Sequence, residues 1–278
     1  MTLSLMLLAC TSPSEPAPDG PPRWVSLSPA VTETIATLGR QDILVGRSEW
    51  CSLPSSVARL PAVGSALTPD LEALARLQPT AILVDGSNGI DRAPLERIAP
   101  VTVLPWLSVA EVADSVEALG LPLDRPAEAN ALAAKLRQLD VPAPAEGPEV
   151  LLSLSEDPRQ GDVWYVRADS LHGAALHAAG GRNALPDASG GAPSLSLEGL
   201  LALDPDIIVV MTSRPVDDVV RAEILANWAP LAPLGAVASG RIGVLGGPSV
   251  LSPGPAVLET ATALRAELAR TQVEGTAP

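Results

Sequence analysis

The chain has 278 residues, of which 47% are hydrophobic and 18% are charged, so it can bury one large core or two smaller ones. Aromatic residues make up only 2% and Phe is absent, so Leu, Val, Ile and Ala must fill the interior. The formal net charge of −14 argues against direct binding to nucleic acid or to an anionic membrane, because neither would gain from contact with so acidic a surface.

The N-terminal segment differs in composition from the rest of the chain. Residues 3–9 are apolar but too few to span a bilayer, and they fit a short signal-peptide core without a basic segment ahead of it. The letters LLAC at residues 7–10 resemble the bacterial lipobox, in which a signal is cut before a cysteine that then receives lipid. We therefore expect residues 1–22 to form a lipoprotein signal and a Pro-rich tether, with Cys10 as the lipidation site. A disordered tail with an incidental cysteine is the alternative.

The chain has two cysteines, Cys10 and Cys51. If Cys10 carries lipid, Cys51 is left as an unpaired thiol, which is tolerated when it is buried. No disulfide can then stabilise the fold. A Cys10–Cys51 bridge is the alternative.

The segment after the tether alternates short apolar strands with helices. Pro29 suits the first turn of a helix that Gly39 ends, and Glu33 lies near the positive end of that helix. Such alternation is typical of a parallel sheet with helices on both faces. The pattern predicts strands over residues 23–28, 43–46, 80–84 and 101–104, and helices over 29–39, 69–77 and 91–98.

Residues 108–139 carry two helical patterns without a strand, followed by the breaker VPAPAEGP. This stretch predicts a rigid connector between two lobes, and a pair of surface helices within one domain is the alternative. We therefore predict an α/β fold of two Rossmann-like lobes with parallel sheets, divided into residues 23–107, 108–147 and 148–278. The second lobe is expected to have strands over 149–155, 163–166, 206–211 and 241–245, and helices over 170–179, 195–203, 216–226 and 255–269.

A helix–proline–strand segment occurs twice, as DLEALARLQPTAILVDGS at 70–87 and SLEGLLALDPDIIVVMTS at 196–213. Eight of the 18 aligned positions are identical, among them Glu72 and Glu198. The helix macrodipole alone could explain an acidic residue early in each helix. With Thr68 and Ser194 as N-caps, however, the glutamates would be the fourth helical residues, one beyond the capping-box position. Their retention in both copies therefore favours a shared role.

Catalytic motifs are absent from the sequence, which contains no CxxC, GxGxxG, P-loop or GxSxG pattern. His172 and His177 fall on different faces of one predicted helix, so they cannot form the i,i+4 zinc pair of a metalloprotease. The acidic residues are scattered and no carboxylate pair stands out. The sequence predicts no metal centre and no catalytic site, and a binding protein is expected rather than an enzyme.

Ligands of open α/β sheets bind beyond the carboxyl ends of the strands. Aromatic rings are scarce, with five Trp and one Tyr, so rings at strand ends are expected to cover an apolar or planar ligand. Ordinary surface packing is the alternative for each ring. Trp24 is expected in the core, and Trp228 is expected to pack against the second lobe. The candidate binding residues are Ser28, Pro29, Trp50, Ser65, Trp106, Trp164 and Tyr165, with the loops at 86–88, 189–194 and 246–249.

Five segments together resemble the helical-backbone (class III) periplasmic binding proteins, which deliver vitamin B12, ferric siderophores, haem or some metals to ABC importers. They are RWVSLSPAVTETIATLG, ILVGRSEWCSLP, LPAVGSALTPDLEALARLQPTAILV, LHGAALHAAGGRNAL and SLSLEGLLALDPDIIVV, and the match runs over about residues 23–268. SLSPAVTE and SEWCSLP look most similar to the cobalamin-binding branch. The resemblance implies two α/β lobes joined by one long helix, with little hinge closure on binding.

The resemblance also implies roles for single residues. One glutamate on each lobe docks onto arginines of the transporter's membrane subunits, and Glu72 and Glu198 match these positions. The corrinoid lies between the lobes against aromatic rings. Trp50 and Trp164 match such ring positions, with Ser28, Pro29, Ser65 and Trp106 as neighbours. Tyr165 or His172 would be iron contacts if the cargo were haem or a ferric siderophore.

Two segments depart from the family pattern. The loop GSALTPD lacks both the aromatic residue of many cobalamin binders and the Tyr that ligates haem, and SPGPAVLE lacks the usual Arg. The chain has two His, too few for the zinc or manganese branches. We therefore predict a lipid-anchored, monomeric substrate-binding protein of the periplasm or cell surface, with a corrinoid as cargo, an ABC permease as partner and no resident cofactor. Alternatives are haem or a ferric siderophore as cargo, or a cofactor-handling enzyme or accessory protein on this fold.

Overall fold

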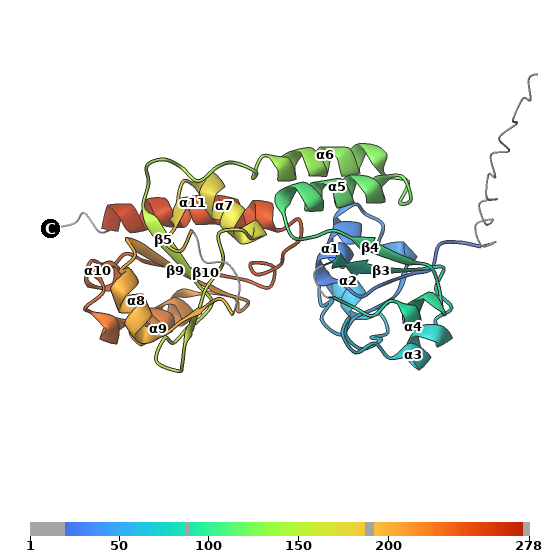
Figure 1. The fold of residues 1–278 in the computed structure, drawn as a ribbon, viewed down its shortest axis with the longest axis horizontal. Helices are drawn as coiled ribbons and strands as arrows, with labels where there is room; N and C mark the ends of the chain where they lie inside the picture. Colours follow the sequence, from blue (N-terminus) through green and yellow to red (C-terminus); the bar gives the residue numbers. More distant parts are fainter. Residues whose placement is uncertain (1–19, 87–88, 187–191, 275–278) are drawn as a thin grey trace, which may run out of the picture.

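The structure is a computed structural model that describes residues 20–86, 89–186 and 192–274. Two parallel four-stranded sheets, one from each half of the chain, form two lobes that lie side by side (Figure 1). A further pair of short strands, β6 (Val163–Trp164) and β8 (Ser194–Leu195), is antiparallel. The predicted α/β class with two parallel-sheet lobes is confirmed.

The N-terminal lobe has the strand order β2-β1-β3-β4. Its first helix begins where predicted, because Ser28 Oγ accepts a hydrogen bond from the Val31 N–H at 3.3 Å and Pro29 occupies the first turn. The strands are β1 (Trp24–Ser26), β2 (Leu44–Arg47), β3 (Ala81–Asp85) and β4 (Val101–Leu104). The helices are α1 (Pro29–Thr37), α2 (Ser55–Ala58), α3 (Leu71–Arg76) and α4 (Ala93–Glu96), with a 3₁₀ turn at Gln41–Ile43.

The C-terminal lobe has the strand order β10-β9-β5-β7. In chain order, β5, β7, β9 and β10 take the places of β1, β2, β3 and β4, so the two lobes share one topology, as the repeated segment suggests. The strands are β5 (Glu149–Ser153), β7 (Arg182–Asn183), β9 (Ile207–Thr212) and β10 (Ile242–Gly246). The helices are α7 (Leu171–Ala179), α8 (Leu197–Leu203), α9 (Asp218–Trp228), α10 (Gly235–Ala238) and α11 (Val257–Glu274), with a 3₁₀ turn at Ala229–Leu231.

Two details of the second lobe differ from the prediction. The strand expected over residues 163–166 is reduced to β6, which pairs with β8 outside the main sheet. The edge strand β7, which pairs with β5 through Arg182 and Asn183, is missing from the prediction. Two residues are too few to give a periodic pattern, so only tertiary pairing reveals such a strand.

The connector between the lobes consists of two helices, α5 (Val109–Gly120) and α6 (Pro126–Arg137), which pack side by side (Figure 1). The resemblance implies one long backbone helix, but the structure has two shorter helices that form a hairpin. Residues 121–125 turn the chain, with Asp124 at a φ of 56°, and Pro126 starts the second helix. Gly120 permits the close approach, because a Cβ there would lie 2.7 Å from the Cβ of Ala129.

One apolar cluster joins the lobes. It holds buried side chains of α1 in the N-terminal lobe, of α5 and α6, and of α7 and α11 in the C-terminal lobe. Leu83 of β3 and Val209 of β9 face this shared cluster, whereas Ile82 and Ile208 face separate clusters on the opposite sides of the two sheets. Helices α3 and α4 cover the opposite face of the first sheet, and α8 and α9 that of the second. Both sheets are therefore buried on both faces.

The repeated helices begin two residues later than predicted. Their N-caps are Asp70 and Ser196, whose side chains accept hydrogen bonds from the N–H groups of Ala73 at 2.9 Å and Gly199 at 3.1 Å. The expectation of caps two residues earlier, in each copy, is wrong. The two repeated glutamates, Glu72 and Glu198, consequently stand at the second helical position, where the macrodipole favours a carboxylate by about 0.3–1 kcal/mol.

We predict that Gly120→Ala lowers the free energy of unfolding by about 1–3 kcal/mol, because the new methyl group would overpack the α5–α6 contact. Helix propensity alone predicts the opposite sign, a gain of about 0.5–1 kcal/mol. Gly199→Ala in α8 is the matched control, since its Cβ would meet no atom closer than 3.4 Å and should stabilise the chain. Urea unfolding of both variants measures the difference, and a stabilising Gly120→Ala would contradict the packing argument.

Candidate functional site

A cavity of about 400 Å³ lies between the lobes. Its walls come from the first half of α1, which follows β1, and from the loops that follow β2 in the N-terminal lobe and β9 and β10 in the C-terminal lobe. These are carboxyl ends of parallel strands, where ligands of α/β sheets bind. The lining residues are Pro29, Glu33, Trp50, Cys51, Ser52, Leu53, Ser213, Pro248, Leu251, Ser252 and Pro253. We refer to this cavity as the interlobe cleft.

Two of the predicted binding residues, Pro29 and Trp50, line the interlobe cleft. The Trp50 side chain is 69% exposed, an unusual state for a ring in a chain so poor in aromatic residues. Its loop is held by a hydrogen bond from the Ser52 N–H to the Trp50 carbonyl at 3.0 Å. Trp50 is therefore an exposed ring on the wall of the interlobe cleft.

Cys51 lies beneath the Trp50 loop and is buried. Thr32 Oγ1 donates to its Sγ at 3.1 Å, and Ser48 Oγ lies 3.2 Å from the same sulfur. The thiol thus serves as a small packed group within the N-terminal lobe. Cys10, the expected lipidation site, lies outside the described residues.

Three other predicted residues lie away from the cleft lining. Ser28 is fully buried as the N-cap of α1. Ser65 is tied into a local turn, with its Oγ 2.9 Å from Thr68 Oγ1. Trp106 is only 6% exposed, and its Nε1 donates to the Pro253 carbonyl at 2.9 Å. Trp106 therefore fastens a C-terminal-lobe loop to the N-terminal lobe.

The two residues proposed as iron contacts are also buried. Tyr165 belongs to the apolar cluster beneath α8 and α9. His172 Nε2 lies 2.9 Å from the Val250 carbonyl, and burial lowers the pKa of its ring. Neither residue lines the interlobe cleft, since Tyr165 packs in the apolar cluster of the second lobe and the ring of His172, on α7, is buried against the Val250 carbonyl.

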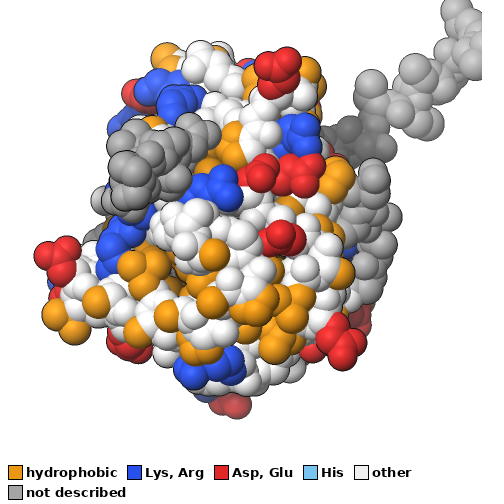
Figure 2. All heavy atoms as spheres, turned by 90° about the vertical axis from the view of Figure 1, so that its left-hand side faces the viewer, with side chains coloured by type: hydrophobic (Ala, Val, Ile, Leu, Met, Phe, Trp, Pro, Cys, Tyr) orange, Lys and Arg blue, Asp and Glu red, His pale blue; other side chains and the backbone are white. Residues whose placement is uncertain are grey.

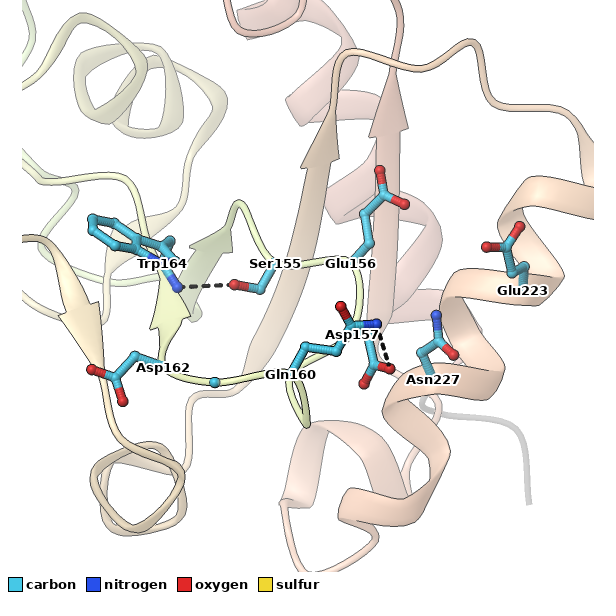
Figure 3. A pocket seen from close by; sticks show the side chains of 9 residues that line it. Ser155, Glu156, Asp157, Gln160, Asp162, Trp164, Glu223 and Asn227 are labelled. Carbon is cyan, nitrogen blue, oxygen red and sulfur yellow. Dashed lines mark hydrogen bonds between the residues drawn. The ribbon is translucent and has the colours of Figure 1, made fainter.

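Trp164 lines a different pocket, of about 380 Å³, within the C-terminal lobe (Figure 3). Its ring is 48% exposed and its backbone N–H donates to Ser155 Oγ at 3.0 Å. The other walls are polar and come from the β5–β6 loop and α9: Glu156, Asp157, Gln160, Gly161, Asp162, Glu223 and Asn227. An ion pair with Arg159 at 2.9 Å lowers the pKa of Asp157 to about 2. The structure therefore does not bring Trp50 and Trp164 into one cavity.

The structure describes only part of the three loops that were predicted to contribute to the site. Residues 87–88 and 187–191 lie outside the described residues. Pro248, from the predicted loop at 246–249, lines the interlobe cleft. The loop between β10 and α11 thus contributes to the site beyond the four residues predicted.

Glu33 is a cleft residue that the sequence prediction did not select. Its carboxylate accepts hydrogen bonds from Ser252 Oγ and, at 2.8 Å, from the Ala256 N–H, both in the C-terminal lobe. Burial raises the pKa of Glu33, and these two hydrogen bonds partly offset that effect. The sequence placed Glu33 early in a helix, but gave no sign of a partner in the other lobe.

Glu72 and Glu198 lie on α3 and α8, on the sheet faces opposite the shared apolar cluster. In Figure 1 both helices lie on the lower side of their lobes, away from α5, α6, α7 and α11. The Glu72 side chain is 85% exposed and pairs with Arg76 at 2.5 Å. Glu198 is exposed as well, between the partly exposed side chains of Leu197 and Leu201.

The excess of acidic residues does not form a single acidic surface at the outer end of the C-terminal lobe. Figure 2 shows acidic, basic and apolar side chains interspersed over this face. Such mixing is typical of a solvated surface. The acidic side chains on this face therefore need no cationic binding partner to account for them.

The described residues lack both a membrane-spanning helix and a cluster of metal ligands. Over residues 20–86, 89–186 and 192–274, no helix is both long and apolar enough to cross a membrane. Within the same ranges, no cluster of three or more His, Cys, Asp or Glu side chains could hold a metal ion.

Comparison with known proteins places this geometry in a family. Residues 25–248 match the Periplasmic binding protein family. A cobalamin-binding protein of Halobacterium salinarum is 26% identical over 86% of this chain and 67% of its own length. A vitamin B12-binding protein of Yersinia pestis is 26% identical over 81% of this chain and 79% of its own.

A solved structure has the same fold. The periplasmic haem-binding protein of Pseudomonas aeruginosa superposes with a TM-score of 0.70 at 26% identity, covering 89% of this chain and 92% of that one. The family match covers most of both lobes and eight of the eleven residues that line the cleft. The chain therefore belongs to the periplasmic binding protein family and is a binding protein, not an enzyme.

Proposed function

We propose that this protein is the substrate-binding component of an ABC importer, and that it captures a corrinoid in the interlobe cleft. The names of the Halobacterium and Yersinia relatives support a corrinoid as the cargo. The cleft is of the size usual for small-molecule sites, and its exposed Trp50 can lie against a planar ring system.

The observation that carries the choice of cargo is the chemistry of the cleft lining. Among the described lining residues there is no His, Tyr or Met, and the two that could coordinate a metal, Glu33 and Cys51, are already hydrogen-bonded within the protein. Haem iron in proteins is held by an axial side chain. A corrinoid can bring its own axial ligands, so a cleft without such side chains suits it better.

Haem or a ferric siderophore is the second candidate. The haem-binding protein of Pseudomonas aeruginosa is as similar in sequence as the two corrinoid-binding relatives, which favours haem by the same measure. A ferric siderophore needs no axial ligand from the protein and would also fit the observed lining. The cargo must therefore be decided by direct binding.

Docking to the permease would use the two repeated helices. Glu72 and Glu198 each stand in the first turn of a helix on the side of the lobes away from the connector. Arginines of a membrane subunit could pair with both at once because the lobes share one topology. Glu72 would exchange Arg76 for the new partner at little cost, since exposed i,i+4 pairs contribute only about 0.3–0.5 kcal/mol.

The rest of the chain fits a tethered protein outside the cytoplasm. Residues 1–22 would supply the signal and a Pro-rich tether with lipid on Cys10, followed by a lobe over 23–107, the connector over 108–147 and a lobe over 148–278. The protein would act as a monomer that meets its permease at the membrane surface.

Titration calorimetry with cyanocobalamin, haemin and a ferric siderophore tests the cargo. We expect cyanocobalamin to bind most tightly, with a Kd below about 10 μM, equivalent to some −7 kcal/mol. Trp50→Ala should weaken binding about tenfold or more, because covering the exposed ring contributes about 1.5–3 kcal/mol. Trp164→Ala is the comparison, since that ring lines the separate pocket. If no chelate binds below this limit, the assignment of a metal chelate as cargo is wrong.

Reversing both docking charges tests the role of the repeated helices. Glu72→Arg with Glu198→Arg should abolish uptake of the cargo by cells that carry the permease, through like-charge repulsion of its arginines, while the Kd stays within about threefold. Glu128→Arg with Glu146→Arg makes the same change of charge at exposed sites on the connector and should leave uptake intact. Loss of cargo affinity in the first variant would refute the docking assignment.

A further inference from the structure

The loop between β10 and α11 is held from both lobes. From its own lobe, His172 Nε2 lies 2.9 Å from the Val250 carbonyl. From the N-terminal lobe, Trp106 Nε1 donates to the Pro253 carbonyl at 2.9 Å, and Glu33 accepts from Ser252 Oγ and the Ala256 N–H. We refer to residues 252–256 as the clamped turn.

The clamped turn fits closely against the Glu33 carboxylate. A Cβ on Gly254 would lie 3.0 Å from a Glu33 carboxylate oxygen, so a larger residue there would require the carboxylate or the turn to shift. Hydrogen bonds to a carboxylate are shorter and stronger than neutral ones, and partial burial of Glu33 strengthens them further. These contacts therefore fix the distance between α1 and the N-terminal end of α11.

Glu33 also stands between two cavities. It lines the interlobe cleft and a second cavity of about 480 Å³, which reaches Leu132 and Lys135 of α6. Leu53 is shared by the two linings in the same way. The clamped turn contributes Ser252 and Pro253 to the interlobe cleft, so the position of this turn sets one wall of the site.

We propose that Glu33 is a positioning residue that sets the width of the interlobe cleft and thereby the affinity for the cargo. This inference rests on the proposed function, since it assigns the cleft as the cargo site. His172 keeps the loop attached to its own lobe when the Glu33 contacts are removed. Loss of the carboxylate therefore lets the two lobes shift relative to each other while each lobe remains folded.

Three variants separate this role from a general loss of stability. Glu33→Ala removes both interlobe hydrogen bonds. Glu33→Gln keeps an oxygen that accepts from the Ala256 N–H and an amide that can pair with Ser252. Glu267→Ala is the matched control, because this buried carboxylate also accepts a backbone N–H, from Val244 at 2.7 Å, but only within the C-terminal lobe.

The first measurement needs no cargo. Spin labels on Arg97→Cys, directly after α4, and on Val219→Cys in α9, in a Cys10→Ser background of the full chain, report the distance between the lobes by electron–electron double resonance. We expect Glu33→Ala to shift or broaden the distance distribution, and Glu33→Gln and Glu267→Ala to leave it unchanged. An unchanged distribution in Glu33→Ala would overturn the proposal.

The second measurement is calorimetric titration of the same variants with cyanocobalamin. We expect Glu33→Ala to weaken binding about tenfold or more, Glu33→Gln to stay within about threefold of the native chain, and Glu267→Ala to lower the unfolding midpoint without loss of affinity. A changed lobe distance with unchanged affinity would refute the link between cleft width and binding. Failure of the native chain to bind any chelate would instead refute the proposed function, and the distance measurement would still decide whether Glu33 fixes the lobes.

Discussion

The rest of the structure depends on the apolar cluster that the two lobes share. Buried side chains of α1, α5, α6, α7 and α11 form one continuous layer, so neither lobe completes its core alone. Apolar burial scales with the area removed from water, and opening this layer would expose part of both cores. The lobes are therefore held together on the connector side, and the opposite side is available for loops. Glu33 and Trp106 add directional contacts that apolar packing cannot supply.

The shared topology places the interlobe cleft and the repeated helices on two different surfaces of the molecule. Because all four strands of each sheet are parallel, their carboxyl ends gather at one edge, and α1 meets the loops after β2, β9 and β10 in the interlobe cleft. The repeated helices α3 and α8 cover the faces away from the shared cluster. The part of the chain that is most clearly duplicated thus lies outside the cleft, and the cleft itself is built from loops that differ between the lobes.

Local sequence patterns predicted most helices and strands, because where each begins and ends depends mainly on residues close by in the chain. Alternating strands and helices indicated the parallel sheets, and Pro29 and Gly39 marked the ends of α1. The caps of α3 and α8 differ from the prediction because two capping residues stand two positions apart in each copy. Strand-like pairing of Pro69 with Gly64, and of β8 with β6, keeps the earlier residues out of the helices. The edge strand β7 is missing from the prediction because two paired residues leave no period. The two helical patterns of the connector correspond to α5 and α6, whereas the resemblance implied one long helix.

The sequence by itself determined the fold class, the duplication, the exposed glutamates of the repeated helices and the scarcity of rings, all of which follow from composition or short-range order. Only the tertiary structure decided which rings face the cleft. It left Trp50 exposed, buried Trp106 as a hydrogen-bond donor and placed Trp164 in a separate pocket. It also brought Glu33 to a turn more than half the chain away. Such contacts depend on how two lobes pack, and no local periodicity encodes the partner of a single side chain across that interface.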